Sequence, residues 1–188
     1  MFTGIVQAVG RIEALHPHRV ATGRLPLADV RIGDSICVQG CCLTVVRKAR
    51  GRLWFDLSEE TLRVTAGLDR PGAVNLEKSL GFGDKLGGHL VTGHVDGVGR
   101  VAGKKGSEYT FEAPRSLARY IARKGSVCVD GVSLTVNRVR GRKFEVNLIP
   151  HTLKVTTLGR LARGAKVNLE VDLLARYMER LLERDGKA

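Results

Sequence analysis

GCCLTV at residues 40–45 and GVSLTV at residues 131–136 are near copies of one six-residue phrase. The third letter is Cys42 in the first copy and Ser133 in the second. Outward from this phrase, TGIVQAVGRI from residue 3 matches TGHVDGVGRV from residue 92, ETLRVT from residue 60 matches HTLKVT from residue 151, and VNLE occurs at residues 74 and 167. Paired motifs in one order indicate an internal duplication.

The spacing between the copies stays at about 90 residues, which predicts two modules with small insertions in their turns. We divide the chain into a first module at residues 1–86, a second at residues 87–172, and a tail at residues 173–188. Each module consists of short runs rich in Val, Leu, Phe and Thr that glycines separate, which predicts an all-β fold of small antiparallel barrels. Gly51 and Gly141, each in an Arg-Gly-Arg triplet, are predicted hairpin turns.

The tail DLLARYMERLLER predicts a helix of about three turns, with Asp172 as its N-cap. Its apolar stripe contains Leu174, Tyr177, Met178, Leu181 and Leu182. A helix this short is marginal alone, so the stripe needs a partner. Packing on a barrel of the same chain and a helix bundle between subunits are both open.

Composition gives 31 Lys and Arg against 19 Asp and Glu, a net charge of +12, in 188 residues. The basic residues gather in turn-like stretches and in the tail without interleaved aromatic residues, so a nucleic-acid partner is not expected. No run reaches the roughly 20 apolar residues of a membrane helix, and the start lacks a secretory pattern, so we expect a cytoplasmic protein without a membrane partner. The four cysteines are expected to be reduced thiols, and their spacing does not suit zinc.

Residues shared by the two modules are expected to bind the ligand, and residues that differ are expected to take part in the reaction. Two modules with the same backbone positions and different side chains suit a reaction in which two copies of one molecule take opposite roles. The differing pairs are Cys42 and Ser133, Ile5 and His94, Glu60 and His151, and Gln7 and Asp96.

Six motifs in order, MFTGIV, GCCLTV, ETL, GGHLVTGHVDG, DGVSLTVN and IPHTL, cover essentially the whole chain. Together they closely resemble riboflavin synthase of the type with two lumazine-binding repeats. The resemblance implies two six-stranded barrels, a homotrimer held partly by the tail helices, and no cofactor or metal. It also implies that two molecules of 6,7-dimethyl-8-ribityllumazine exchange a four-carbon unit, giving riboflavin and 5-amino-6-ribitylaminouracil.

That reaction needs a proton removed from the 7-methyl group of one lumazine and a nucleophile added to the ring of the other. A thiolate is a strong nucleophile near neutral pH, so Cys42 is a candidate, with water or a ribityl hydroxyl as alternatives. His94 suits proton transfer, and Ser133 and Phe2 complete the candidate catalytic set. Phe2 is either core or a lid over the ring, and its difference from the matching Val91 favours a functional role.

The resemblance also implies two sets of substrate-binding residues. Around the first lumazine they are Gly4, Ile5, Val6, Cys42, Leu43, Thr44, Asp56, Leu57, Ser58, Glu59, Glu60 and Thr61. Around the second they are Gly93, His94, Val95, Lys124, Ser133, Leu134, Thr135, Asn147, Leu148, Ile149, Pro150, His151 and Thr152. Cys37 and Cys128 are expected in the core, and His89 in a hydrogen bond within its turn. A non-catalytic lumazine or flavin carrier and a basic nucleic-acid-binding barrel are the alternative functions.

Overall fold

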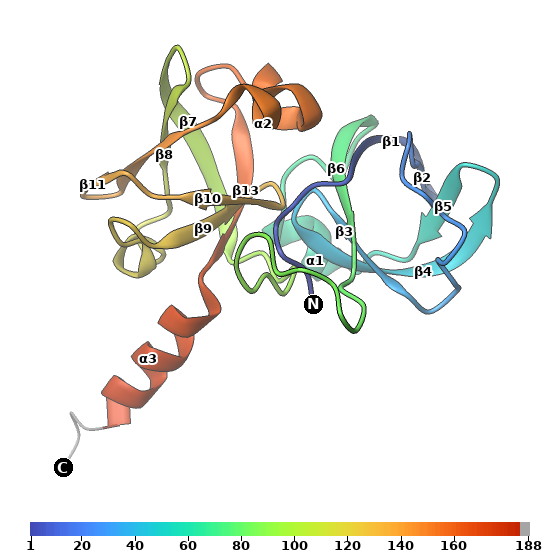
Figure 1. The fold of residues 1–188 in the computed structure, drawn as a ribbon, viewed down its shortest axis with the longest axis horizontal. Helices are drawn as coiled ribbons and strands as arrows, with labels where there is room; N and C mark the ends of the chain where they lie inside the picture. Colours follow the sequence, from blue (N-terminus) through green and yellow to red (C-terminus); the bar gives the residue numbers. More distant parts are fainter. Residues whose placement is uncertain (185–188) are drawn as a thin grey trace.

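Residues 1–184 are described by the computed structural model, which contains two β-structures side by side and one helix that projects from the second (Figure 1). The last four residues of the predicted tail, 185–188, lie outside the described part. Among the described residues no helix is long and apolar enough to span a bilayer.

The first barrel is a closed antiparallel sheet of six strands in the order β1-β2-β5-β4-β3-β6, which closes by the pairing of β6 with β1. Its elements are β1 (Ala8–Leu15), β2 (His18–Ala21), β3 (Ser35–Val38), β4 (Cys41–Ala49), β5 (Arg52–Phe55), α1 (Glu59–Val64) and β6 (Gly72–Lys78). Alternate side chains point inward, so Ile12, Val20, Leu53 and Phe55 are buried in one core. The predicted barrel is confirmed for this module.

The second module forms one antiparallel sheet of seven segments in the order β10-β9-β13-β7-β8-β12-β11. Its elements are β7 (Gly97–Lys105), β8 (Glu108–Glu112), η1 (Ala118–Tyr120), β9 (Ser126–Val129), β10 (Val132–Thr135), β11 (Arg138–Arg140), β12 (Lys143–Asn147), α2 (Pro150–Val155), η2 (Thr157–Arg160) and β13 (Lys166–Val171). β10 and β11 together occupy the place of β4, and they are separated at residues 136–137. β4 bears a register shift at the matching place, between Val45 and Arg47, so one predicted strand is divided in the second module. The predicted six-stranded barrel is therefore present there as a seven-stranded sheet, whose end strands β10 and β11 are not paired with each other.

The two predicted hairpin glycines are confirmed, because Gly51 has a φ of 67° and Gly141 a φ of 58°. A left-handed backbone of this kind favours glycine, which has no Cβ to clash with the carbonyl groups. Each glycine joins two paired strands, β4 to β5 and β11 to β12.

Helix α3 (Leu173–Arg184) follows β13 and extends away from both barrels (Figure 1). The predicted cap is confirmed, since the Asp172 carboxylate accepts a hydrogen bond of 3.0 Å from Leu174 N. On its polar side Glu179 accepts from the Tyr120 hydroxyl and pairs with Arg119 at 3.0 Å, which ties the helix to η1. The five stripe residues are 62–70 % exposed, so the stripe does not pack on a barrel of the same chain.

The two modules meet where the β3–β4 and β9–β10 hairpins touch, and an added Cβ at Gly40 would lie 2.9 Å from Gly131 N. Each hairpin is held by an asparagine of the opposite module. Asn75 Nδ2 donates to Asp130 O at 2.8 Å, and Asn168 Nδ2 donates to Gln39 O at 2.9 Å. These reciprocal hydrogen bonds give the seam an approximate twofold symmetry.

The symmetry of the seam is broken at Gln39 and Asp130. Gln39 Nε2 reaches Thr157 Oγ1 at 3.4 Å, whereas the matching position opposite Asp130 is Ala66, and Asp130 Oδ2 has no hydrogen-bond partner. Asp130 is only 2 % exposed, and burial raises the pKa of its carboxyl to about 7, against the lowering effect of the hydrogen bond from Asn168 N.

We expect Asp130→Asn to stabilise the protein at pH 8 by about 1–3 kcal/mol and to have little effect at pH 4. The raised pKa means that the folded state holds the proton more tightly than the unfolded chain. The contribution of Asp130 to stability is therefore present below about pH 4 and lost as the pH rises towards 7. Denaturant unfolding of both proteins at the two pH values measures this, and a variant less stable than the parent at pH 8 would contradict it.

Candidate active site

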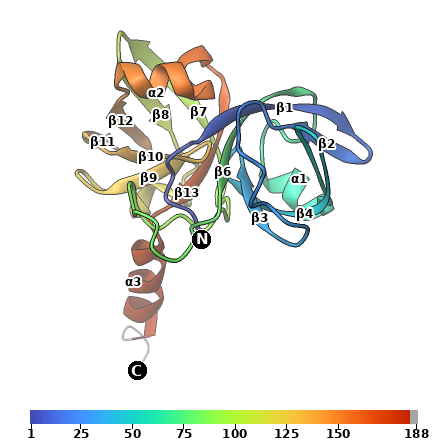
Figure 2. The same ribbon diagram turned by 45° about the vertical axis from the view of Figure 1, so that its right-hand side comes forward.

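The N-terminal segment does not stay on the first barrel but crosses to the second (Figure 2). Gly4 O accepts a hydrogen bond of 2.8 Å from Ser133 N, and Val6 packs against the core of the second module. Gly4 has a φ of 76°, and a Cβ there would lie 2.6 Å from the Ser133 Cβ. The crossing therefore needs glycine at this position.

The start of the second module makes the reciprocal crossing. Gly93 O accepts a hydrogen bond of 2.8 Å from Cys42 N, and Val95 packs against the core of the first barrel. Gly93 has a φ of 77°, and a Cβ there would lie 2.6 Å from the Cys42 Cβ. The two TGxV segments, residues 3–6 and 92–95, are thus exchanged between the modules.

Two buried glutamates hold the crossing segments. Glu77 accepts from Thr3 N at 2.8 Å, from Thr3 Oγ1 at 2.9 Å and from Gly4 N at 3.0 Å. Glu170 accepts from the matching atoms of Thr92 and Gly93 at 2.7–2.9 Å. Burial raises the pKa of each carboxyl, and these hydrogen bonds partly offset the rise.

The exchange corrects the predicted grouping of the binding residues. Residues 4–6 lie with residues 133–135, and we call this place, with residues 147–152 at the end of β12, the Ser133 site. Residues 93–95 lie with residues 42–44, and we call this place, with residues 56–61, the Cys42 site. The sequence assigned each TGxV segment to its own module because a pattern of strands carries no information on which barrel a flanking arm covers.

The remaining predicted binding residues lie beside these segments. In the first barrel, Val45 pairs with Phe55, which brings Thr44 and Asp56 to neighbouring positions, and Ser58 caps α1 by accepting from Thr61 N at 3.1 Å. In the second module, Pro150 begins α2 directly after β12. Lys124 is exposed, and its backbone N–H donates to Val136 O at 2.7 Å, next to β10.

His89 belongs to the Ser133 site, which corrects the prediction of a hydrogen bond within its own turn. Its Nδ1 lies 2.7 Å from Ser133 Oγ, and its backbone N–H donates to Thr3 O at 3.1 Å. Burial lowers the pKa of the imidazole, so it is neutral near pH 7 and can accept the hydroxyl proton. Nothing in the repeat comparison could have indicated this pair, because the first module has no counterpart of His89.

Cys42 is the half-buried cysteine, while Cys37, Cys41 and Cys128 are buried. The prediction that Cys37 and Cys128 are core residues is confirmed by exposures of 2 % and 1 %. Burial raises the pKa of the Cys41 thiol to about 12 and also raises that of the Cys37 thiol well above its usual range, so neither supplies a thiolate at neutral pH. Cys42 remains the candidate nucleophile.

Among the other differing pairs, His94 and Ile5 are exposed on the crossing segments, as a role towards a bound ring requires. Glu60 is exposed and pairs with Arg63 at 2.5 Å, and His151 is exposed near the start of α2.

Phe2 does not serve as a lid over a ring. It is fully buried with Cys37, Cys128 and Val91, and it forms an antiparallel bridge with Val91. The predicted counterparts Phe2 and Val91 therefore meet each other across the seam. Phe2 thus anchors the arm that carries Gly4, and its backbone N–H donates to Val91 O at 2.7 Å.

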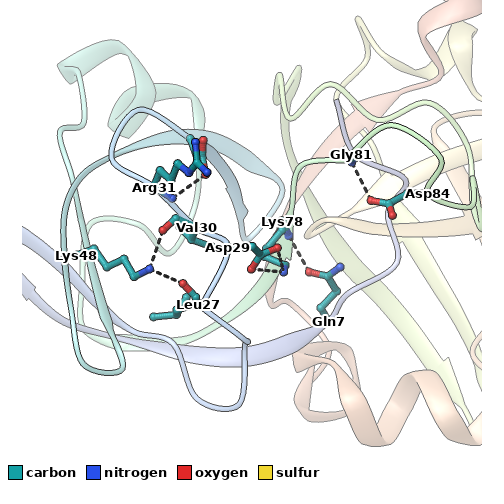
Figure 3. Close-up of polar contacts among 10 residues, drawn as sticks. Gln7, Leu27, Asp29, Val30, Arg31, Lys48, Lys78, Gly81 and Asp84 are labelled. Carbon is teal, nitrogen blue, oxygen red and sulfur yellow. Dashed lines mark hydrogen bonds and ion pairs between the residues drawn. The ribbon is translucent and has the colours of Figure 1, made fainter.

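A cleft of about 630 Å³ opens beside the Ser133 site, between the N-terminal arm and the segment that joins the modules. Ile5, which is 48 % exposed, and Gly87 line it. Its opposite wall is fixed by Lys78, which pairs with Asp29 at 2.7 Å (Figure 3). Ile5 is therefore reachable from solvent along this cleft.

Comparison with known proteins agrees with the internal duplication of the chain. The profile of the lumazine binding domain family matches twice, at residues 3–79 and 92–172. The riboflavin synthase of Photobacterium phosphoreum is 47 % identical over 194 residues, covering 97 % of this chain and 89 % of the relative. That of Mycobacterium bovis is 47 % identical over 201 residues, covering 99 % and 100 %.

The chain belongs to the riboflavin synthase family. This member of the riboflavin synthase family also resembles solved structures of LumP. The complex of LumP with 6,7-dimethyl-8-(1'-D-ribityl) lumazine has 27 % identity and a TM-score of 0.78, and the complex with riboflavin has 29 % and 0.79. Each covers 91 % of this chain and 99 % of LumP.

Each of the two matched segments of the family profile contains one of the phrases that carry Cys42 and Ser133. The Cys42 site combines a thiol with His94, and the Ser133 site combines a hydroxyl with His89.

Proposed function

We propose that the protein is a riboflavin synthase that converts two molecules of 6,7-dimethyl-8-ribityllumazine into riboflavin and 5-amino-6-ribitylaminouracil. The observation that carries the proposal is the reciprocal crossing of the TGxV segments, which builds two like sites with unlike reactive groups. A reaction between two copies of one molecule needs that combination. The full-length relatives named riboflavin synthase support it.

In the proposed reaction the two sites do different work. At the Cys42 site a nucleophile adds to the ring of one lumazine, and Cys42 is our candidate, with His94 as the group that moves protons beside it. At the Ser133 site the neutral His89 and the Ser133 hydroxyl, 2.7 Å apart, suit removal of a proton from the 7-methyl group of the other lumazine. The conjugated ring spreads the resulting charge, so a weak base suffices. The four-carbon unit then passes to the accepting ring.

Positioning supplies much of the acceleration in this proposal, because well-oriented reacting groups reach effective molarities of about 10⁵ M or more. The exchange of segments supports this part of the proposal, since each arm is anchored by a buried glutamate on one barrel and faces the other barrel. The reaction requires no metal or other cofactor in our proposal.

The proposal includes a homotrimer in which a Cys42 site of one subunit faces a Ser133 site of its neighbour. The α3 stripe supports it, because five large apolar side chains on one short helix are 62–70 % exposed. We keep residues 1–86, 87–172 and 173–188 as the proposed units of the sequence, although residues 2–6 pack against the second module. A cytoplasmic location is proposed because Cys37, Cys41 and Cys128 are thiols without bridges.

A carrier of lumazine or flavin is the second candidate function. The structures of LumP with a lumazine, riboflavin and flavin mononucleotide favour it, because they show that this fold holds such rings. A carrier would not need different reactive groups in its two sites.

Incubation of the purified protein with 6,7-dimethyl-8-ribityllumazine alone is expected to give one riboflavin for every two lumazines consumed. Riboflavin fluorescence and chromatography of the second product measure this, and a sample treated with chelator should react at the same rate. Tight binding without conversion would support the carrier. Activity that chelation removes and a metal restores would contradict the cofactor-free reaction.

A further inference from the structure

Arg176 on α3 contacts the crossing segment that carries His94. Its Nη2 donates to His94 O at 3.0 Å and pairs with Asp96 Oδ1 at 2.8 Å. The side chains of Arg176 and Asp96 are 36 % and 13 % exposed. α3 lies beyond both repeats, so a residue outside the duplicated frame reaches into one of the two sites.

The first module shows what this contact adds. Gln7, the counterpart of Asp96, accepts a hydrogen bond of 2.9 Å from Lys78 N (Figure 3). Asp96 makes the matching bond, since its Oδ2 accepts from Val171 N at 2.8 Å. The second oxygen of Asp96 is then free for Arg176, whereas the side-chain amide of Gln7 bears no charge that would attract a guanidinium.

The His94 segment is thereby held at both ends. Glu170 accepts from Thr92 and Gly93 on one side of His94, and Arg176 binds His94 O and Asp96 on the other. Burial raises the pKa of the Asp96 carboxyl, and the hydrogen bond from Val171 N and the Arg176 guanidinium both lower it. Loss of Arg176 would leave a largely buried carboxylate without its ion pair.

We infer that Arg176 is a positioning residue, which fixes the His94 segment at the Cys42 site and links it to the helix α3. The inference rests on the proposed function for its kinetic consequence. It does not depend on contact between Arg176 and substrate, since Arg176 acts through the backbone of His94 and through Asp96.

The test compares Arg176→Ala and Arg176→Lys with Arg180→Ala as the matched control on the same helix. Arg180 is 76 % exposed at its side chain, and within the described part of the chain its ion pair is with Glu183, at 3.6 Å. We expect Arg176→Ala to lower kcat about tenfold or more, with KM changed less than about twofold, because it displaces His94 while residues 42–44 and 56–61 of the Cys42 site stay in place. Arg176→Lys should restore part of kcat through the charge.

Sedimentation of the same variants separates positioning from assembly. Arg176 lies off the apolar stripe, so Arg176→Ala should keep the oligomeric state of the parent. Asp96→Asn in the Arg176→Ala background should cost no further activity, because the two residues act as one unit. Unchanged kcat in Arg176→Ala, or a loss that follows dissociation of the oligomer, would overturn the inference.

A readout independent of turnover keeps the two proposals apart. The imidazole resonances of His94 should shift in Arg176→Ala and stay in place in Arg180→Ala, whether or not the parent protein makes riboflavin. A parent without synthase activity would contradict the proposed function alone. Unshifted His94 resonances in Arg176→Ala would contradict the positioning role alone.

Discussion

A chain that ends at Asp172 is expected to lose assembly and nearly all turnover while it still binds lumazine. Removal of α3 removes the exposed stripe, on which the proposed subunit contacts depend. Without those contacts two rings on different subunits meet only by collision, so the rate should fall by about 100-fold or more at micromolar protein. Sedimentation, the rate of riboflavin formation and titration with a lumazine analogue measure the three parts.

Leu181→Arg is a second variant for the same question, because it places a charge in the stripe and keeps the contacts of Arg176 and Glu179 with the second module. It should dissociate the oligomer and lower turnover like the truncation. A truncated chain that sediments as a monomer and keeps full turnover would show that both rings meet within one chain.

Gly93→Ala is expected to lower kcat/KM by about 100-fold or more. A Cβ at this position would lie 2.6 Å from the Cys42 Cβ and 2.7 Å from Cys42 N. Neither atom can move aside without a shift of the β4 backbone. The His94 segment must therefore move away from the Cys42 site. The hydrogen bond of 2.8 Å from Cys42 N to Gly93 O should be lost with it. Steady-state kinetics and thermal unfolding measure the two effects.

Gly141→Ala is the control, because Gly141 also has a positive φ, of 58°, but an added Cβ there meets no atom within 4 Å. It should cost about 1–2 kcal/mol of stability through backbone strain alone and leave kcat/KM near that of the parent. Equal losses in the two variants would mean that strain, and not the close approach to Cys42, limits the reaction.

The duplicated sequence was sufficient to predict both β-modules, the hairpin turns at Gly51 and Gly141, and the cap at Asp172. These features depend on local backbone preferences and on the alternation of side chains along strands. The match between Cys42 and Ser133 also predicted two unequal sites. Each of these predictions needed only neighbouring residues or a comparison of one repeat with the other.

The exchange of the arms needed information that a pair of repeats does not contain. Gly4 could lie over its own barrel or the other one with the same local conformation, and the contact with Ser133 spans more than 100 residues of chain. His89 and Arg176 were missed for a related reason, since neither has a counterpart in the first module. Tertiary packing alone brings them to the sites.

The crossed arms of Gly4 and Gly93 also fit a history of this chain. A single ancestral module that paired with a copy of itself would exchange its TGxV arms across a twofold axis, as swapped dimers do. Such a dimer has two identical pockets, so any change at the Cys42 position would appear in both. Joining two copies in one polypeptide keeps the exchanged arms and lets each pocket mutate separately. In this history the fold did not change, and the fusion of two copies allowed the two originally identical pockets to become different.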